Sequence, residues 1–198
     1  MLNLKSLAIT GGFSSGKSSV CSILQEHGAY VAQCDSIVHS LYDSDKELQT
    51  KVINLFGEDV KSNGTIDRNR LAEKAFSDKQ QLKALEEIVH PLVRATIQKE
   101  RDQAEKSGIH PLFVAEVPLL FEGDLHTFFD YTLFVDCDRK KAIERASDRG
   151  FSEEEYILRM ENQLPIPDKK RQADFVIENN GNKQELESAV MELLHKIV

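Results

Sequence analysis

The segment from Gly11 to Ser18 combines glycines, hydroxyls and one lysine in a pattern suited to holding phosphate groups. It fits GxxxxGK[ST] without a gap. Glycines let the backbone wrap closely around an anion and turn its N–H groups inward, and a helix start adds partial positive charge. Lys17 supplies a compact cation for the β- and γ-phosphates, and the Ser18 hydroxyl suits Mg²⁺. The pattern predicts a P-loop for ATP and Mg²⁺, with nucleotide contacts from Gly12, Phe13, Ser14, Ser15, Gly16, Lys17, Ser18 and Ser19.

A carboxylate follows the next apolar segment of the chain. Asp35 comes directly after a short predicted strand, and ligands collect at the carboxyl ends of strands in open α/β sheets. There it can accept a hydrogen bond from an acceptor hydroxyl, and in a loose phosphoryl-transfer transition state orientation is its main task. The alternative is that Asp35 only caps a helix.

Two arginines recur at helical spacing in a charged segment. Arg145 and Arg149 are four residues apart and share a helix face. They can neutralise charge on a transferred phosphoryl group. The alternative is a solvated charged face, which most charge runs are.

The elements that position these residues follow from the hydrophobic pattern. Continuous apolar runs predict buried strands at residues 4–10, 30–34, 112–117, 131–135 and 175–177. Helical periodicity covers residues 17–28, 37–56, 82–97, 139–149 and 152–163 and the C-terminal segment. Pro91 lies inside the third of these helices and is expected to kink or divide it. Apolar strands that alternate with helices predict an α/β fold with a parallel sheet covered on both faces.

Composition narrows the class of protein. The chain has 198 residues and a net charge of −8, which argues against sequence-independent nucleic-acid binding. Cys21, Cys34 and Cys137 form no CxxC pair, so we expect buried free thiols. No secretory signal and no apolar run of the roughly 20 residues that a membrane helix needs are found. We therefore expect a cytoplasmic protein with no membrane contact, either a monomer or a small homo-oligomer.

The remaining motifs fall into one order. Ile9 leads through Thr10 into the P-loop, and the motifs that follow are Asp35-Ser36-Ile37, Leu55-Phe56-Gly57, Ile66-Asp67-Arg68, His90-Pro91-Leu92-Val93, Pro118-Leu119-Leu120-Phe121-Glu122 and Ala173-Asp174-Phe175-Val176-Ile177 running into Asn179-Asn180-Gly181. In this order and spacing the chain resembles the dephospho-coenzyme A kinase family over essentially its whole length.

The resemblance implies ATP-dependent phosphorylation of the ribose 3′-hydroxyl of dephospho-coenzyme A, with magnesium. It implies a P-loop kinase fold with a five-stranded parallel sheet and three parts. These are a core of about 1–60, 110–138 and 172–198, a helical acceptor-binding insertion of about 61–109, and a lid of about 139–171.

The same resemblance implies roles for individual residues. Lys17, Asp35 and Arg145 are the expected catalytic residues, and Ser18 is the expected metal ligand. ATP contacts beyond the P-loop are expected from Arg145, Arg149, Asn179, Asn180 and Gly181, and acceptor contacts from Asp35, Arg68, His90, Pro118 and Leu119. For some of these a purely structural role stays open, namely a backbone-satisfied histidine for His90, a surface arginine for Arg68 and a simple tight turn for residues 179–181. Glu116 and Glu122 are further carboxylates near strand ends and are candidates for the metal's water shell.

Two positions depart from the family pattern. The family usually has GGIGSGK at the loop, and here Phe13 and Ser14 replace the isoleucine and the middle glycine. Serine lacks the freedom of glycine to take positive φ, although we expect the loop to survive. The family also usually has an aspartate where this chain has Gln33, which cannot ionise, so any metal-charge role of that position is in doubt.

Two other functions compete with this one. The first is another small-molecule P-loop kinase that acts on a nucleoside or nucleotide, and the second is a regulatory protein that binds ATP without an acceptor. The segment around residues 60–110 discriminates between the kinases, because the P-loop is common to both.

Overall fold

The computed structural model describes residues 4–62 and 64–198. The chain forms two units, of which the first comprises the chain up to Gln33 together with Glu100–Val198, and the second comprises Cys34–Lys99. These bounds differ from those of the insertion expected at 61–109. The second unit already begins directly after the second strand of the sheet.

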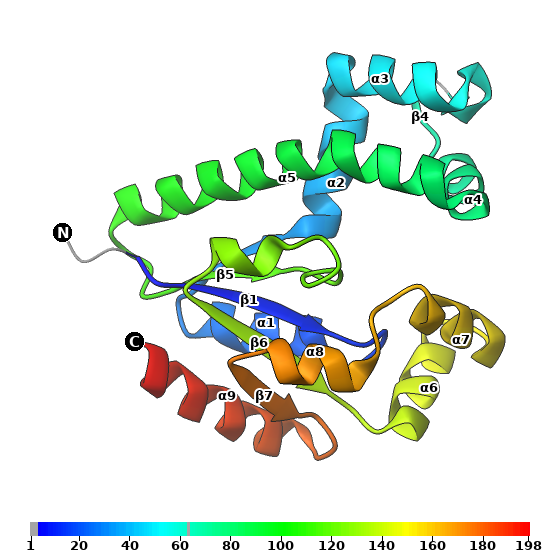
Figure 1. Cartoon of the computed structure of the whole chain (residues 1–198). Helices are drawn as coiled ribbons and strands as arrows, with labels where there is room; N and C mark the ends of the chain where they lie inside the picture. The colour runs from blue at the N-terminus through cyan, green and yellow to red at the C-terminus, as the bar shows by residue number, and fades with distance from the viewer. Residues whose placement is uncertain (1–3, 63) are drawn as a thin grey trace. The chain divides into compact units, whose positions relative to one another are not determined.

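Five parallel strands form the central sheet of the first unit (Figure 1). Their order is β2-β5-β1-β6-β7, with bounds β1 Ser6–Gly11, β2 Tyr30–Gln33, β5 Phe113–Glu116, β6 Tyr131–Asp136 and β7 Phe175–Glu178. All four pairings are parallel, and β1 at the centre is buried along its whole length. This confirms the predicted α/β class and the five-stranded sheet, whose strands are mostly apolar, as is typical of strands that helices cover.

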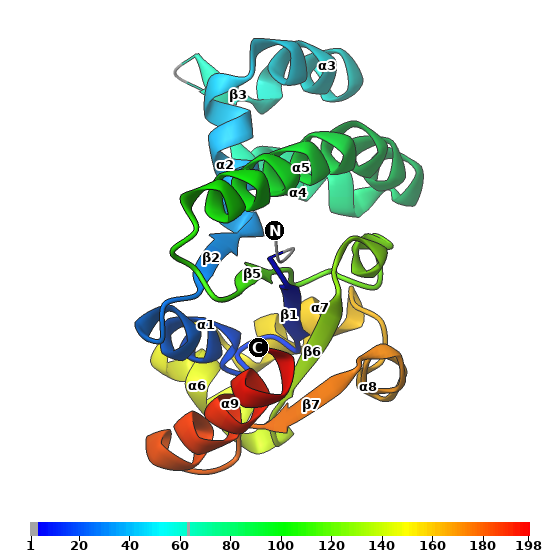
Figure 2. The same cartoon turned by 90° about the vertical axis from the view of Figure 1, so that its left-hand side faces the viewer.

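Two helices cover one face of this sheet. Figures 1 and 2 show α1 (Lys17–Glu26) beside α9 (Lys183–Ile197), at opposite ends of the first unit's chain. Their apolar sides close a core with residues from four of the strands, including Leu7, Ile9 and Val135, each fully buried. The remaining elements of the unit are η2 (Leu125–Phe128), α6 (Arg139–Asp148), α7 (Glu153–Glu161) and α8 (Ile166–Gln172).

The second unit is mainly helical. It contains α2 (Cys34–Ser44), α3 (Lys46–Phe56), η1 (Glu58–Val60), a short hairpin of β3 (Lys61–Ser62) and β4 (Thr65–Ile66), α4 (Arg68–Ser77) and most of α5 (Lys79–Ser107). The single helix predicted over 37–56 is in fact two helices, because the Asp45 side chain accepts from Leu48 N at 3.0 Å and caps a new start.

Pro91 does not divide its helix. α5 is one helix over 29 residues with Pro91 inside it, although a proline in a helix interior costs about 3 kcal/mol. Leu85, Val89, Val93 and Ile97 are buried along one face of α5, and burial of such side chains contributes about 1.5–3 kcal/mol each. Packing therefore outweighs the local penalty.

Two further sequence expectations concern thiols and membranes. All three cysteines are free, as predicted, with Cys21 and Cys34 buried and Cys137 half-buried. Over residues 4–62 and 64–198, the helices are all too short or too polar to cross a bilayer.

At the amino ends of the strands, an aspartate just before each of two strands accepts hydrogen bonds from the neighbouring strand. The Asp130 carboxylate accepts from the backbone N and the hydroxyl of Ser6, both at 2.8 Å, and Arg101 donates to it at 3.0 Å. Asp174 repeats the arrangement one strand further, accepting from the backbone N of Thr132 at 2.8 Å and its hydroxyl at 2.7 Å. Neighbouring strands β1, β6 and β7 are thus held in register by side chains as well as by their ladder.

The Asp130 contact predicts a dependence of stability on pH. Burial disfavours the charged carboxylate, but hydrogen bonds from Ser6 and the charge of Arg101 outweigh it and lower the pKa of Asp130. A carboxyl with a lowered pKa stabilises the fold above its unfolded value of about 3.9 and loses that contribution as the pH falls further. We expect Asp130→Asn to lower the free energy of unfolding by about 1 kcal/mol at neutral pH, and the difference from the parent to shrink between about pH 5 and pH 3.

Urea unfolding across this pH range measures the effect. Glu192→Gln removes an exposed carboxylate of α9 and serves as the matched control, with stability close to the parent throughout. A constant difference between Asp130→Asn and the parent down to pH 3 contradicts the prediction.

Candidate functional site

The P-loop joins β1 to α1. Gly11 ends β1, Lys17 begins α1, and the turn between them is closed by Gly16, whose φ of 97° requires glycine. The Lys17 ammonium donates to the carbonyl oxygens of Gly11 at 3.1 Å and Gly12 at 2.9 Å. The strand, turn and helix start predicted for this motif are confirmed, and Lys17 lies against the loop that it was expected to serve.

Ser14 occupies a position where the family usually has glycine. Its φ is 58°, in the left-handed region that costs a residue with a side chain about 1–2 kcal/mol. The hydroxyls of Ser14 and Ser15 are buried and without hydrogen-bond partners within the described chain. Buried hydroxyls normally find a partner, and an anion held in the loop supplies acceptors for both. The loop therefore keeps its shape despite the serine, and its unsatisfied donors fit a phosphate group.

The loop after β7 packs directly against the P-loop. Asn179 is buried, and its Nδ2 donates to the Ser15 carbonyl at 2.8 Å. Arg145 of α6 donates to the same carbonyl at 3.3 Å and to the Asn179 carbonyl at 3.1 Å. The Asn180 side chain accepts from Asp138 N at 2.8 Å, and its carbonyl accepts from Lys141. Three predicted nucleotide-binding segments thus meet at one point.

A pocket of about 440 Å³ opens beside this junction. Its walls come from the P-loop, from the outer side of α1, from α6 and from the start of α9, and its lining residues are Gly16, Ser19, Ser22, Ile23, Glu26, Arg145, Asn179, Gly181, Asn182, Lys183 and Leu186. The pocket therefore lies between the predicted phosphate loop and residues 179–181, and is large enough for a small organic ligand.

The tip of the P-loop contacts α6 and α7 through an aromatic cluster. The Phe13 ring meets the Phe151 ring edge to face at a centroid distance of 5.1 Å, and Arg149 and Arg159 lie over it at 5.6 Å and 4.9 Å. The backbone N of Phe13 donates to Met160 Sδ at 3.3 Å. The structure separates the two arginines expected to share one role, since Arg145 reaches Ser15 whereas Arg149, just beyond the end of α6, covers Phe13.

Glu116 is a carboxylate at the carboxyl end of the sheet. It ends β5 and is in register with Ile9 of β1 and Gln33 of β2, on either side. Burial, together with the charge of Glu116 and a hydrogen bond to it, raises the pKa of the Cys21 thiol. Cys21 lies on α1, the helix that begins with Lys17. Its thiol therefore stays protonated and donates to Glu116.

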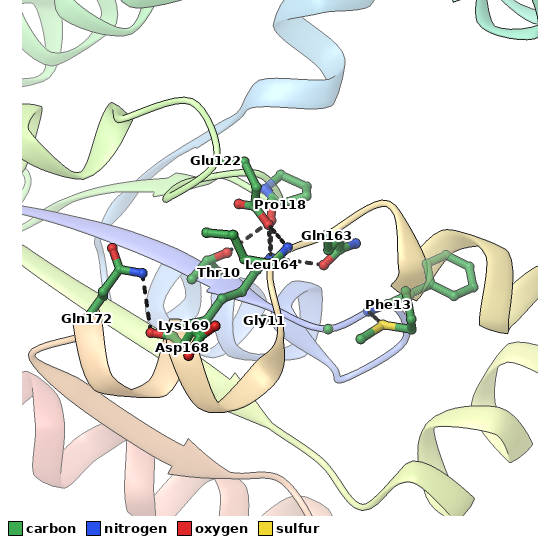
Figure 3. Close-up of polar contacts among 12 residues, drawn as sticks. Thr10, Gly11, Phe13, Pro118, Glu122, Gln163, Leu164, Asp168, Lys169 and Gln172 are labelled. Atoms are coloured by element: carbon green, nitrogen blue, oxygen red, sulfur yellow. Dashed lines mark hydrogen bonds and ion pairs between the residues drawn. The ribbon is translucent and has the colours of Figure 1, made fainter. Parts of the chain in front are cut away.

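Glu122 has a different environment from the one expected. Its Oε1 lies 2.7 Å from the Lys169 ammonium and accepts from Leu164 N at 2.9 Å (Figure 3). The carbonyl of Pro118 accepts from the Thr10 hydroxyl at 3.1 Å, and Leu119 beside it is exposed. Glu122 thus forms an ion pair within the protein through Oε1, whereas its Oε2 is buried without a hydrogen-bond partner among the described residues.

Three predicted acceptor residues belong to the second unit. Asp35 is exposed in the first turn of α2, and Arg68 is the exposed first residue of α4. His90 is half-buried on α5, where burial and the charge of Arg94 lower its pKa against the opposing effect of Glu86. His90 is therefore neutral near pH 7.

Sequence reasoning missed Arg159, Met160 and Lys169. Arg159 and Met160 lie in a helix with an ordinary amphipathic pattern, and Lys169 is followed by Lys170 and Arg171, a run typical of a solvated surface. Nothing in local composition distinguishes the one buried lysine of that run, because two of its three partners come from residues 118–122.

The contact between Gly16 and Asn179 yields a test of the junction. A Cβ at Gly16 would lie 2.0 Å from Asn179 Nδ2, whereas a Cβ at Gly108 has nothing within 4 Å, and both residues have positive φ. We expect Gly108→Ala to lower the free energy of unfolding by about 1 kcal/mol from backbone strain alone. Gly16→Ala is expected to cost about 3 kcal/mol, because it also breaks the buried amide contact, and to weaken ATP binding at least about tenfold.

Thermal melts and ATP titration calorimetry measure both quantities on both variants. Equal losses of stability in the two variants, with ATP affinity unchanged in Gly16→Ala, would refute the importance of the junction.

Comparison with known proteins identifies the family of the chain. The dephospho-CoA kinase family model matches residues 5–185. A dephospho-CoA kinase of Protochlamydia amoebophila is 41% identical, covering 100% of this chain and 98% of that protein. A crystal structure from Thermus thermophilus, 34% identical, superposes with a TM-score of 0.86 over 99% of both chains. Dephospho-CoA kinase from Campylobacter jejuni, 26% identical, gives 0.70 over 97% of this chain and 96% of that one. With its P-loop, five-stranded parallel sheet and full-length similarity, the chain belongs to the dephospho-CoA kinase family.

Proposed function

We propose that this chain transfers the γ-phosphoryl group of ATP to the ribose 3′-hydroxyl of dephospho-coenzyme A, which yields coenzyme A and ADP. The observation that carries the proposal is the junction of P-loop, Arg145 and Asn179 around the Ser15 carbonyl, in a chain that matches this family along its length. The reaction forms a bond between the acceptor oxygen and the γ-phosphorus. It breaks the bond between that phosphorus and the β,γ-bridging oxygen.

The P-loop side of the site holds ATP. Lys17 contacts two neutral carbonyls, and phosphate oxygens are stronger, charged acceptors for the same ammonium. The hydroxyls of Ser14 and Ser15, together with backbone amides at the start of α1, complete the cradle for the phosphates. The pocket bounded by Asn179 and Gly181 takes the nucleoside, and Arg145 lines that pocket while it contacts the P-loop at Ser15.

Oxygen donors near Lys17 suit a magnesium ion. Residues 4–62 and 64–198 contain no cluster of three or more His, Cys, Asp or Glu side chains, and Mg²⁺ bound with a nucleotide needs only one or two protein donors beside the phosphates. Ser18, exposed in the first turn of α1, and Glu116 are the residues that would hold it. When bound, the ion neutralises charge that develops on the phosphates.

Asp35 orients the acceptor hydroxyl. The chain reaches it two residues after Gln33, which ends β2 at the carboxyl edge of the sheet. Its carboxylate accepts a hydrogen bond from the 3′-hydroxyl and takes its proton late in the transfer, because little nucleophile activation is needed in a loose transition state. Gln33 contributes no charge, so metal binding relies on the other donors.

The acceptor contacts come from the second unit and from the loop after β5. Arg68 provides a cation for an anionic group of the coenzyme, and neutral His90 provides a hydrogen bond. Pro118 and Leu119 place an exposed apolar surface next to the strand that leads into the P-loop. We assign acceptor binding to residues of about 61–109 and the lid to about 139–171.

The lid excludes water from the transferred group. Arg149 and Arg159 cover Phe13 at the tip of the P-loop, so the phenylalanine that replaces the usual isoleucine provides the contact surface for α6 and α7. Water is the competing acceptor in any kinase, and closure protects ATP from hydrolysis.

A coupled ADP-release assay tests the function. With Mg²⁺ and ATP, we expect release to rise at least about a hundredfold on addition of dephospho-coenzyme A, and to stay near background with AMP, CMP or pantothenate. Formation of coenzyme A is checked by mass. A response to AMP or CMP instead supports a nucleotide kinase, and ATP binding with no acceptor response supports a regulatory protein.

Asp35→Asn separates orientation of the acceptor from ATP binding. We expect kcat to fall about 100- to 1000-fold, because the amide cannot take the proton, while the Kd for ATP changes less than about threefold. Lys17→Ala is the comparison, since it is expected to weaken ATP binding and to lower kcat together. An Asp35→Asn enzyme with the turnover of the parent would remove Asp35 from its assigned role.

A further inference from the structure

Lys169 is a charged side chain buried in the first unit, with 1% of its surface exposed. Its ammonium has three N–H groups and three oxygen acceptors, which are Glu122 Oε1 at 2.7 Å, Gln163 Oε1 at 3.0 Å and the Pro118 carbonyl at 3.3 Å. Figure 3 shows these groups converging on the Lys169 side chain from the connection between α7 and α8 and from the loop after β5. Because its donors are all used within the protein, Lys169 is no candidate for a phosphate ligand.

Two of the three partners of Lys169 have a second connection. Glu122 Oε1 also accepts from Leu164 N at 2.9 Å, in the connection between α7 and α8. The Pro118 carbonyl also accepts from the hydroxyl of Thr10, the residue before the P-loop glycines. One ammonium thus joins the base of the P-loop, the loop after β5 and the end of the lid segment.

α8 is held to the sheet at a second point. Lys170, next to Lys169, pairs with Asp136 at the end of β6. The preceding helices, α6 and α7, contact the P-loop through different groups, namely the aromatic cluster around Phe13 and the Arg145 side chain. The contacts of the Lys169 network begin at residues 163 and 164, so the two kinds of contact divide the predicted lid between α7 and α8.

Stability alone is a weak reason for such a pair. Desolvation of two buried charges offsets most of their attraction, and an apolar pair of similar volume often serves the fold as well. A fixed geometry is the property that an apolar pair does not supply.

We propose that Lys169 is a positioning residue for phosphoryl transfer, which with Glu122 holds α8 and Leu164 to the sheet so that only residues of about 139–163 close over ATP. This rests on the kinase function proposed above. Without the pair, the position of Leu164, where the closing segment joins α8, is no longer fixed relative to the P-loop. Closure then no longer excludes water reproducibly.

The test compares Lys169→Met with the parent in two ADP-release reactions, with and without dephospho-coenzyme A. We expect acceptor-dependent kcat to fall about 30-fold, the KM for ATP to change less than about threefold, and the share of ADP released without acceptor to rise about tenfold. A merely structural role lowers the amount of folded enzyme and both reactions equally, so an unchanged share overturns the proposal.

Two further variants keep the test decisive. The double variant Lys169→Met with Glu122→Leu removes both charges, and we expect its melting temperature to lie near that of the parent. We also expect it to keep the raised share of ADP released without acceptor. It therefore serves as the test even if Lys169→Met alone does not fold. Recovery of the parent's rate and coupling in this double variant overturns the proposal. Arg171→Met on the same helix breaks only the exposed pair with Asp168 and is the matched control, expected to behave like the parent.

Amide hydrogen exchange provides a readout independent of catalysis. We expect Leu164 N–H to exchange at least about tenfold faster in the double variant than in the parent, because its acceptor Glu122 is gone and its segment is released. Parent-like protection at residues 164–172 overturns the proposal. A parent with no response to dephospho-coenzyme A counts against the kinase function alone, and the exchange result then decides on the pair.

Discussion

The carbonyl oxygen of Ser15 is the point on which the arrangement of the site depends. A phosphate cradle needs backbone N–H groups turned inward, so the carbonyls of the same peptide units must point outward, where a buried carbonyl requires donors. Asn179 and Arg145 supply those donors from two other segments, at 2.8 Å and 3.3 Å. One backbone conformation of the loop therefore has two consequences: N–H groups that point inward for phosphate, and a Ser15 carbonyl that points outward and needs Asn179 and Arg145 as donors.

This requirement explains why distant segments of the chain assemble where they do. β6 and β7 flank β1 on one side, so their carboxyl ends deliver α6 and the Asn179 turn to the same edge as the P-loop. Parallel topology makes this automatic, because strands that run in one direction all end at one edge. The aspartate contacts at the opposite edge, Asp130 with Ser6 and Asp174 with Thr132, hold the same three strands in register and so fix where their other ends lie.

Sequence reasoning predicts those features whose cause is local or periodic. The P-loop follows from its own residue types, and the five strands follow from mostly apolar runs, since burial leaves few polar positions inside them. The split at Asp45 was also encoded locally, by a side chain that caps α3, but the helical periodicity on either side concealed it. Pro91 shows the converse, because an apolar face that packs along α5 overrides a strong local signal.

The features that escaped prediction depend on partners far away in the chain. The residue type of Ser14 does not by itself indicate a left-handed backbone, and only the glycine that the family usually has there points to it. Phe13 is an ordinary apolar substitution until α7 brings Arg159 and Met160 over it. Lys169 is indistinguishable from Lys170 and Arg171 by composition, and it differs from them only because Glu122, from a distant part of the chain, reaches it across the fold.

The cations of the site differ in what holds them, and this difference decides what each can do. A chain with a net charge of −8 concentrates Lys17, Arg145 and Lys169 around one edge of its sheet. Lys17 and Arg145 donate to neutral carbonyls, which charged phosphate oxygens outcompete. Lys169 is paired with the carboxylate of the half-buried Glu122, so moving it toward a phosphate removes the cationic partner of that carboxylate. The acceptors that the fold supplies thus distinguish Lys17 and Arg145, whose carbonyl contacts can be exchanged for phosphate contacts, from Lys169, which is paired with a carboxylate.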